Sequence, residues 1–296
     1  MQRKQPDMTC IELIDTPPAE LYRLVADVTT WPVIFEQVVQ VQRLQRGHGA
    51  EWFRLWTVAG GRVRTATLRR WLNPDRLRIA IDADPDDSGL PSPFAGRWSF
   101  HPVADGRSEV VLDQPAEVRD APRVLAALNR VAGQGHPLGD VLFSFADTLP
   151  LETDAEHAYA FVADARRWPE RLPHVSRVVL HEHPPGVQHL EMDTITADGG
   201  RHTTRSVRVC FPASRIVYKQ LLPPTLLLGH AGAWDFSPAG VATATHTVAV
   251  DVSRTADVLG EGATLAQAQQ FLRDVLAANS RTTLRAAAEH TKRQAA

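Results

Sequence analysis

Hydrophobic and polar residues alternate in short runs along most of the chain, which is the pattern of half-buried β-strands. Turn-type sequences such as NPDR and ADGR separate the runs, which favours hairpins and an antiparallel sheet. In the first half of the chain the predicted strands lie at residues 10–14, 38–44, 51–58, 62–72, 77–83, 94–100 and 108–114.

Helical spacing of apolar residues replaces the alternation directly after the first predicted strand. Pro17 and Pro18 suit the first turn of a helix, and Thr16 is the expected N-cap before them. We expect the Trp31-Pro32 pair to end this helix.

A further helix is predicted to close each half of the chain. In the first half it begins near Pro122, and Gly133 and Pro137 cut it short. In the second half Thr264 and Gln267 match a capping box ahead of a long apolar stripe, which predicts a long helix.

Two motifs of the first half recur in the second half in the same order. VADVTTWP at Val25–Pro32 returns as VADARRWP at Val162–Pro169, and GRWSF at Gly96–Phe100 returns as GAWDF at Gly232–Phe236. The period is far longer than that of a solenoid repeat, so the chain is predicted to contain two copies of a whole domain.

The predicted architecture is therefore α+β, with an N-terminal domain at residues 1–139 and a C-terminal domain at residues 140–296. A long antiparallel sheet with one amphipathic helix must curl around that helix to bury its apolar face. A sheet that grips the helix at only one end leaves a hollow. We expect each domain to be a curved sheet wrapped around a long C-terminal helix, with an interior cavity.

Composition narrows the class of partner. Lys and Arg total 32 against 34 Asp and Glu, a formal net charge of −2, so no broad basic field is available for nucleic acid or an anionic membrane. Cys10 and Cys210 have no metal-like spacing and suggest neither a zinc site nor a disulfide framework. No apolar signal core precedes the first domain, so we expect a cytoplasmic protein with a small-molecule partner.

Two arginines stand on predicted apolar strand faces. Arg70 alternates with Leu68 in the first copy, and Arg205 alternates with Val207 and Val209 on the face taken as its match in the second. Arginine stays charged, so on a buried face it needs a carboxylate or an oxygen-rich ligand. The alternative is an edge arginine whose head reaches solvent.

Aromatic and titratable residues distinguish the two copies. Trp98 and Trp234 each share a strand face with a glycine, which leaves room beside the ring, although such residues are more often core. Tyr218 stands where we align Ile79 in the first copy, so the second copy alone has a hydroxyl there. Two histidines are also confined to the second copy, His174 and His202.

These motifs, with the Arg69-Arg70 pair, the RLPHV stretch from Arg171 and the SVRVCFP stretch from Ser206, resemble the didomain aromatase/cyclases of bacterial type II polyketide synthases. The resemblance spans nearly the whole chain and implies two helix-grip domains of the START or Bet v 1-like superfamily. It implies a poly-β-ketone substrate on an acyl carrier protein, first-ring aldol closure and dehydration, and no cofactor. It further suggests closure between C7 and C12 on a chain already reduced by a partner ketoreductase.

From the strand faces and the resemblance we predict four catalytic residues: Arg70, Arg205, Tyr218 and His174. The predicted substrate-binding residues are Arg69, Trp31, Trp98, Trp168, His202, Arg208 and Trp234. Arg70 matches the cavity arginine of single-domain relatives, but Ala66 and Leu68 replace the aromatic and hydroxyl residues that precede it there. We therefore expect the first domain mainly to hold the substrate chain and the second to supply acid and base groups.

Two other functions are compatible with the same pattern. One is a non-catalytic carrier of a lipid or polyketide, because fold alone does not assign function. The other is a steering chaperone that enforces the bend of the chain and leaves dehydration to solvent. His181 and His183 share a strand face, but they lack a third ligand nearby in sequence, so we predict no metal site.

Overall fold

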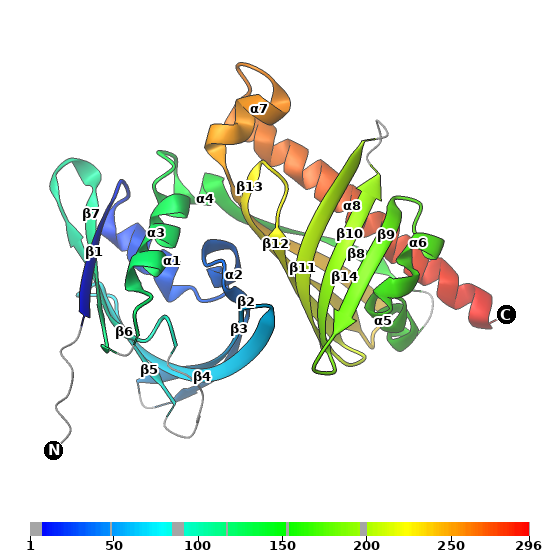
Figure 1. Ribbon diagram of the computed structural model, residues 1–296, viewed down its shortest axis with the longest axis horizontal. Coiled ribbons are helices and arrows are strands. Elements are labelled where there is room, and N and C mark those ends of the chain that lie inside the picture. Colours follow the sequence, from blue (N-terminus) through cyan, green and yellow to red (C-terminus); the bar gives the residue numbers. More distant parts are fainter. Residues whose placement is uncertain are drawn as a thin grey trace. The chain divides into compact units, whose positions relative to one another are not determined.

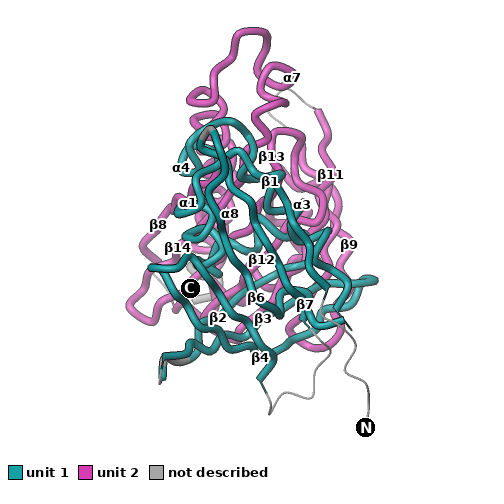
Figure 2. Tube along the Cα trace, turned by 90° about the vertical axis from the view of Figure 1, so that its left-hand side faces the viewer, with its two compact units in different colours: residues 1–141 teal, residues 142–296 magenta. Residues whose placement is uncertain are grey.

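Two seven-stranded antiparallel sheets form the framework of the structure, a computed structural model (Figure 1). The structure describes residues 8–47, 49–84, 92–116, 118–151, 154–195 and 200–295. The chain divides into unit 1, Met1–Val141, and unit 2, Leu142–Ala296, each with one of the sheets (Figure 2).

Unit 1 contains seven strands and four α-helices among its described residues. Its strands are β1 (Met8–Ile14), β2 (Val38–Gly47), β3 (Ala50–Ala59), β4 (Arg62–Asn73), β5 (Arg78–Ala83), β6 (Gly96–Pro102) and β7 (Ser108–Gln114). Its helices are α1 (Pro18–Ala26), α2 (Trp31–Ile34), α3 (Ala121–Ala132) and α4 (Leu138–Val141).

Unit 2 repeats this order of elements and ends in a longer helix. Its strands are β8 (Leu142–Pro150), β9 (Val175–Glu182), β10 (Val187–Ile195), β11 (Arg201–Phe211), β12 (Arg215–Leu222), β13 (Leu227–Ser237) and β14 (Val241–Val250). Its helices are α5 (Ala155–Ala163), α6 (Trp168–Arg171), α7 (Thr255–Leu259) and α8 (Leu265–Ala295).

The two sheets have the same topology. The strand order is β1-β7-β6-β5-β4-β3-β2 in unit 1 and β8-β14-β13-β12-β11-β10-β9 in unit 2. The first strand of each unit pairs with the last, and the other neighbours are successive hairpins. The duplicated antiparallel sheet expected from the alternation of residues is confirmed.

The closing helices differ in length. α8 has 31 residues and follows the sheet of unit 2 as the long orange-to-red helix of Figure 1, whereas α3 has 12 residues and ends at Gly133. The capping box of α8 is present, because Oε1 of Gln267 accepts from the amide of Thr264 at 2.8 Å and Oγ1 of Thr264 accepts from the amide of Gln267 at 3.3 Å. A long closing helix is therefore found in unit 2 and not in unit 1.

The start of unit 1 corrects two expectations. Thr16 does not cap α1, because Pro17 occupies the N-cap position and the Thr16 hydroxyl donates to the carbonyl of Ala132 at 2.8 Å. Trp31 and Pro32 do not end α1 either, since that helix ends at Ala26 and they begin α2. Proline lacks an amide hydrogen that the first helical turn would leave unpaired, so it suits this position.

Aromatic rings fill much of the interior of unit 1. The ring of Trp31 lies 4.7 Å from Phe94, 5.5 Å from Phe35 and 5.6 Å from Phe53, measured between centroids, and all four side chains are fully buried. Trp98 is buried as well, and its indole N–H donates to the carbonyl of Phe94 at 3.3 Å. The predicted substrate-binding residues Trp31 and Trp98 thus lie in the hydrophobic core.

Candidate active site

Unit 2 contains a cavity of about 390 Å³ between the inner face of its sheet and α8. This volume lies within the range of roughly 300–1,000 Å³ that small-molecule sites occupy. Its apolar lining comes largely from Trp168, Leu190, Met192, Leu226, Trp234, Phe271, Leu272, Val275 and Leu276. Its polar lining includes His174, Thr194, His202, Thr204, Ser206, Arg208, Tyr218, Gln220, His230, His246, Asn279, Ser280 and Thr283.

The central polar residues stand in one row across four neighbouring strands. Arg208 of β11 is the register partner of Tyr218 of β12, Tyr218 is the partner of Gly232 of β13, and Gly232 is the partner of His246 of β14. Directly opposed residues in adjacent strands point to the same face of a sheet. The antiparallel register therefore places one guanidinium, one phenol and one imidazole side by side on the cavity wall.

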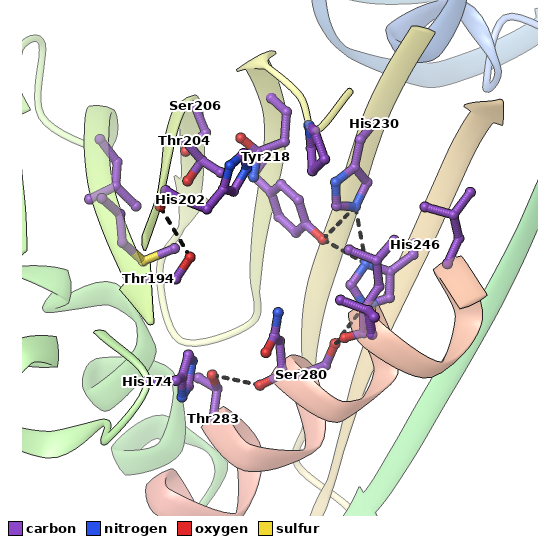
Figure 3. A pocket seen from close by; sticks show the side chains of 18 of the residues that line it. His174, Thr194, His202, Thr204, Ser206, Tyr218, His230, His246, Ser280 and Thr283 are labelled. Atoms are coloured by element: carbon purple, nitrogen blue, oxygen red, sulfur yellow. Dashed lines mark hydrogen bonds between the residues drawn. The ribbon is translucent and has the colours of Figure 1, made fainter. Parts of the chain in front are cut away.

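Tyr218, His230, His246 and Ser280 form a hydrogen-bonded cluster at one end of the cavity (Figure 3). Oη of Tyr218 lies 2.9 Å from Nδ1 of His246 and 3.3 Å from Nε2 of His230, and the two imidazole nitrogens are 3.1 Å apart. Nε2 of His246 lies 2.5 Å from Oγ of Ser280 on α8. Three strands and the closing helix each contribute one member, so the cluster exists only in the folded unit.

Gly232 makes room for the Tyr218 ring. A Cβ atom at this position would lie 2.5 Å from Oη and 2.6 Å from Cζ of Tyr218, and 2.4 Å from the carbonyl oxygen of Thr245. These distances are far below van der Waals contact, so any other residue would displace the ring or the strand. The space that the sequence leaves beside Trp234 is thus occupied by the phenol of Tyr218.

Burial keeps the cluster uncharged at neutral pH. It lowers the pKa of His246 from 6.5 to about 4 and lowers the pKa of His230 well below its ordinary value, with a further contribution from the neighbouring His246. It also raises the pKa of the Tyr218 phenol. The cluster therefore holds a protonated phenol against two neutral imidazoles, which can accept, hold and return a proton.

Arg208 places a permanent positive charge at the cavity wall. It is 2 % exposed, its Nη2 donates to the carbonyl of Val162 at 2.5 Å, and its guanidinium lies 5.1 Å from the centre of the Trp168 ring. Val162 lies in the last turn of α5, where helix carbonyls lack helical partners and the helix dipole favours a cation. Nη1 has no hydrogen-bond partner among the described residues. A buried cation with an unused donor suits an oxygen atom that gains negative charge.

Comparison with known proteins identifies the family to which the chain belongs. Two family models, both described as polyketide cyclase/dehydrase and lipid transport, match residues 12–134 and 151–278. The chain is 45% identical over 295 residues to the actinorhodin polyketide synthase bifunctional cyclase/dehydratase of Streptomyces coelicolor, and the match covers 92% of both chains. The chain belongs to the polyketide cyclase/dehydrase family.

Other relatives share its two-domain form. The granaticin polyketide synthase bifunctional cyclase/dehydratase of Streptomyces violaceoruber is 45% identical over 300 residues, with 95% of this chain and 92% of the relative covered. The crystal structure of the di-domain ARO/CYC BexL from the BE-7585A pathway has a TM-score of 0.83 at 39% identity, covering 97% of this chain and 99% of that chain. StfQ, from the steffimycin pathway, has the same TM-score at 36% identity and the same coverage.

These relatives make the protein an enzyme of the polyketide cyclase/dehydratase class with two tandem helix-grip domains. They support the aromatase/cyclase function predicted from the sequence and do not support the non-catalytic carrier. In the part of the chain that the structure describes, no helix is long and apolar enough to cross a membrane.

The structure brings six of the predicted site residues of this polyketide cyclase/dehydrase to the cavity of unit 2: Trp168, His174, His202, Arg208, Tyr218 and Trp234. Burial lowers the pKa of His174. In unit 1, Arg69 lies with its guanidinium 5.2 Å from the ring of Trp71, and Arg70 is bound to Glu51 at 2.7 Å. The guanidinium of Arg70 is thus occupied by contacts within unit 1, whereas Nε of Arg69 is buried without a hydrogen-bond partner among the described residues.

Arg205 does not lie in the cavity, which corrects its predicted position. Its side chain is 63% exposed and bound to Glu191 at 2.8 Å. The alternation on β11 places Thr204, Ser206 and Arg208 on the cavity face and Arg205 on the other. Arg208 is the counterpart of Arg70, because both arginines donate to a carbonyl in the last turn of the first helix of their unit. The sequence alignment was out of step by one residue at this strand, and one residue inverts the face.

The alignment of Tyr218 with Ile79 was wrong for a similar reason. Tyr218 pairs with Gly232 as Ile81 pairs with Gly96, so Ile81 is its counterpart. The hydroxyl is nevertheless confined to unit 2, as predicted.

Sequence reasoning missed His230, His246 and Ser280. Each had a weak signal, because each interrupts an apolar face of a strand or of the closing helix. A lone polar residue on such a face is common, and only the packing of β13, β14 and α8 brings these three together.

Proposed function

We propose that the cavity of unit 2 catalyses first-ring aldol closure and dehydration of a nascent poly-β-ketone carried on an acyl carrier protein. The closure we assign is C7 to C12 on a chain already reduced by a ketoreductase. The proposal is carried by one observation: a buried, partly unpaired guanidinium stands in one row with the phenol of Tyr218 and the imidazole of His246, two members of the Tyr–His–His cluster, on the wall of a cavity of about 390 Å³.

Aldol closure depends largely on conformation. Methylenes between two carbonyls are already acidic, and both reacting carbons belong to one chain, so the site must select one bend among many. The wall of Trp168 and Trp234 supports selection by shape. The attacked carbonyl oxygen gains negative charge, and the buried guanidinium of Arg208 is the group that would stabilise it.

Dehydration requires a proton taken from carbon and a proton delivered to the departing hydroxyl. Tyr218 is the group that we assign to contact the substrate in both steps, because it lines the cavity and its hydroxyl is bonded to both histidines. His174, predicted as catalytic, lines the cavity away from this cluster (Figure 3), and His202 is a further lining residue; both are assigned to substrate binding.

Unit 1 is assigned no proton-transfer step. Its arginine is neutralised by Glu51, and the positions of Tyr218 and Gly232 hold Ile81 and Gly96. This supports the expectation that unit 2 supplies the acid and base groups, while a role of unit 1 in holding the chain stays a prediction.

Reconstitution tests the proposal. A minimal polyketide synthase with its acyl carrier protein is combined with this protein, with and without a ketoreductase, and the products are identified by mass spectrometry and NMR. We expect a C7–C12 aromatic first ring in place of shunt products when the ketoreductase is present. An unchanged distribution of shunt products on addition of the protein contradicts the proposal.

A further inference from the structure

We infer that Ser280 is a positioning residue that fixes the tautomer of His246, so that Tyr218 and His246 work as a single proton relay. The inference rests on the proposed function, in which Tyr218 contacts the substrate. Ser280 itself lies on α8, behind His246 as viewed from Tyr218 (Figure 3).

The hydroxyl of Ser280 has one proton, which it donates within α8. Oγ donates to the carbonyl of Leu276, four residues earlier in α8, at 2.7 Å. The same oxygen lies 2.5 Å from Nε2 of His246, and with its proton committed it can only accept there. We therefore assign the proton of His246 to Nε2, the tautomer for which Ser280 is the acceptor.

A neutral imidazole with its proton on Nε2 has a free lone pair on Nδ1. Nδ1 of His246 faces Oη of Tyr218 at 2.9 Å and Nε2 of His230 at 3.1 Å. The assignment that gives each of these atoms a partner has His230 donating to Oη of Tyr218, across 3.3 Å, and Tyr218 donating to Nδ1 of His246. The phenol oxygen keeps a lone pair, and its proton already points to a base.

The surrounding packing holds the imidazole of His246 in one orientation. The imidazole stacks on Phe145 of β8 at 5.0 Å between centroids, and His230, His246 and Ser280 are each less than 5 % exposed. His246 contacts the titratable side chains of Tyr218 on β12 and His230 on β13, the ring of Phe145 on β8 and the hydroxyl of Ser280 on α8. Lys219 of β12 acts electrostatically on His230.

This arrangement can recycle one proton through the dehydration. In the first step the C–H bond breaks, its proton passes to Oη of Tyr218, and the Tyr218 proton passes to Nδ1 of His246, leaving an enolate and an imidazolium. In the second step the enolate expels the hydroxyl while the proton returns through Tyr218 to that oxygen. A C–H and a C–O bond are lost, a carbon–carbon double bond and one water form, and the protein regains its initial state.

Removing the Ser280 hydroxyl should move the His246 proton from Nε2 to Nδ1. With alanine at position 280, the Nε2–H of His246 would be a buried donor without an acceptor, which is more costly than a buried acceptor without a donor. The proton is then better placed on Nδ1, where it donates to Tyr218. His246 in that tautomer cannot accept the Tyr218 proton, so the relay fails while the cavity stays intact.

Nitrogen NMR of the ligand-free full chain tests the tautomer directly. The protein is labelled with ¹⁵N-histidine, and the His246 signals are assigned by their loss in His246→Gln. We expect a protonated Nε2 and an unprotonated Nδ1 in the wild type, and a shift toward the opposite tautomer in Ser280→Ala. A wild-type tautomer protonated on Nδ1, or an unchanged tautomer in Ser280→Ala, overturns the inference whatever the protein catalyses.

Kinetics of the reconstituted dehydration supply the second readout. Ser280→Ala should lower kcat by about 10- to 100-fold, below the ~10²- to 10⁴-fold worth of a complete acid–base group, and leave KM unchanged. The matched control is Thr282→Ala, which removes the same kind of hydroxyl bond, to the carbonyl of Ala278 at 2.8 Å, away from the cluster. It should leave both constants unchanged.

The outcomes separate the inference from the proposed function. If Tyr218→Phe slows dehydration but Ser280→Ala does not, the relay is wrong and the assigned site stands. If neither variant changes the rate, the proposed function fails and the relay with it, although the tautomer is still reported by NMR.

Discussion

The same row of sheet positions holds different residues in the two units. In unit 2 the row runs from β10 to β14 through Gln188, Arg208, Tyr218, Gly232 and His246. In unit 1 it runs from β3 to β6 through Glu51, Arg70, Ile81 and Gly96. Gln114 of β7 takes the position of His246, because it follows Asp113, the partner of Arg97. One backbone framework thus carries an ion pair and apolar packing in one copy and a titratable cluster in the other.

The two buried arginines differ in whether the protein itself compensates their charge. Both are 2 % exposed and both donate to a carbonyl in the last turn of a helix, α1 for Arg70 and α5 for Arg208. Arg70 also binds the carboxylate of Glu51, whereas Arg208 faces the uncharged amide of Gln188 and interacts with the carboxylate of Glu182 only electrostatically, without an ion pair. The charge of Arg70 is thus compensated within the protein, and the charge of Arg208 remains available to a ligand.

The largest effect should come from Tyr218→Phe, which gives unit 2 the apolar character that Ile81 gives unit 1. We expect the dehydration rate to fall by ~10²- to 10⁴-fold, because a positioned proton-transfer group is lost, while the fold is kept. The measurement is the rate of aromatic product formation in the reconstituted synthase. Tyr22→Phe is the matched control, since it removes the hydroxyl of a buried tyrosine that packs on Phe100 in unit 1. A steering chaperone would instead lose affinity and keep its rate.

Replacing each arginine with methionine should separate stability from activity. Arg70→Met removes the cation that balances the partly buried carboxylate of Glu51, so we expect unit 1 to lose about 3 kcal/mol of unfolding free energy. Arg208→Met removes a buried charge that has no bound carboxylate, so the unfolding free energy of unit 2 should change by only about 1 kcal/mol, while the cyclisation rate falls by ~10²- to 10³-fold. Hydrogen exchange, measured separately for the strands of each sheet, reports both changes. Equal losses of unfolding free energy in the two units would show that the two arginines do not differ in how their charge is compensated.

Acid should weaken unit 2 through His246. Its pKa is lowered from 6.5 to about 4 in the folded state, so between these values the unfolded chain binds a proton that the folded chain does not. The contribution of His246 to the unfolding free energy of unit 2 is therefore fully present above pH 6.5 and is lost as the pH falls toward 4. At pH 5 the loss from this group is about 2 kcal/mol.

The comparison of wild type with His246→Gln isolates this effect, since glutamine occupies the corresponding position in unit 1. Hydrogen exchange of β13 and β14, corrected for its intrinsic pH dependence, should show a shallower pH dependence in the variant. Parallel pH dependences would mean that His246 titrates alike in the folded and unfolded chains.

The framework could be predicted from the sequence because its signals are local. Period-two alternation marked every strand of unit 1, and the capping box at Thr264 and Gln267 marked the start of α8. The duplicated motifs at Trp31 and Trp168 marked the two copies. Each of these features depends on residues that are close in sequence.

The cavity face of β11 could not be predicted because it depends on register. A single residue of misalignment gave the catalytic role to Arg205, which faces solvent, although Arg208, predicted only to bind substrate, is the arginine that lines the cavity. The pairing of β11 with β12 is itself shifted between Arg205 and Ser206. His246 was missed for a different reason, because its partners lie on β12, β13 and α8, and no spacing along the chain shows that these elements meet.

Gln188→Glu makes the row of unit 2 resemble that of unit 1 most closely and should have the smallest effect. The Gln188 amide donates to the carboxylate of Glu182 at 3.1 Å and to the carbonyl of Ala163 at 3.2 Å, and a glutamate can make neither bond. Repelled by Glu182, the new carboxylate would turn to Arg208 as Glu51 binds Arg70, and would compete with the substrate oxygen for the guanidinium. Removing one oxyanion donor costs ~10²- to 10³-fold in rate, so partial neutralisation should cost roughly 10-fold in the cyclisation step. The reciprocal variant Glu51→Gln is the control, because it alters the same position in the unit without the cluster and should leave the cyclisation rate unchanged. If Glu51→Gln slowed cyclisation as much as Gln188→Glu, the charge of Arg70 would also act on the substrate, and the division between the two units would have to be abandoned.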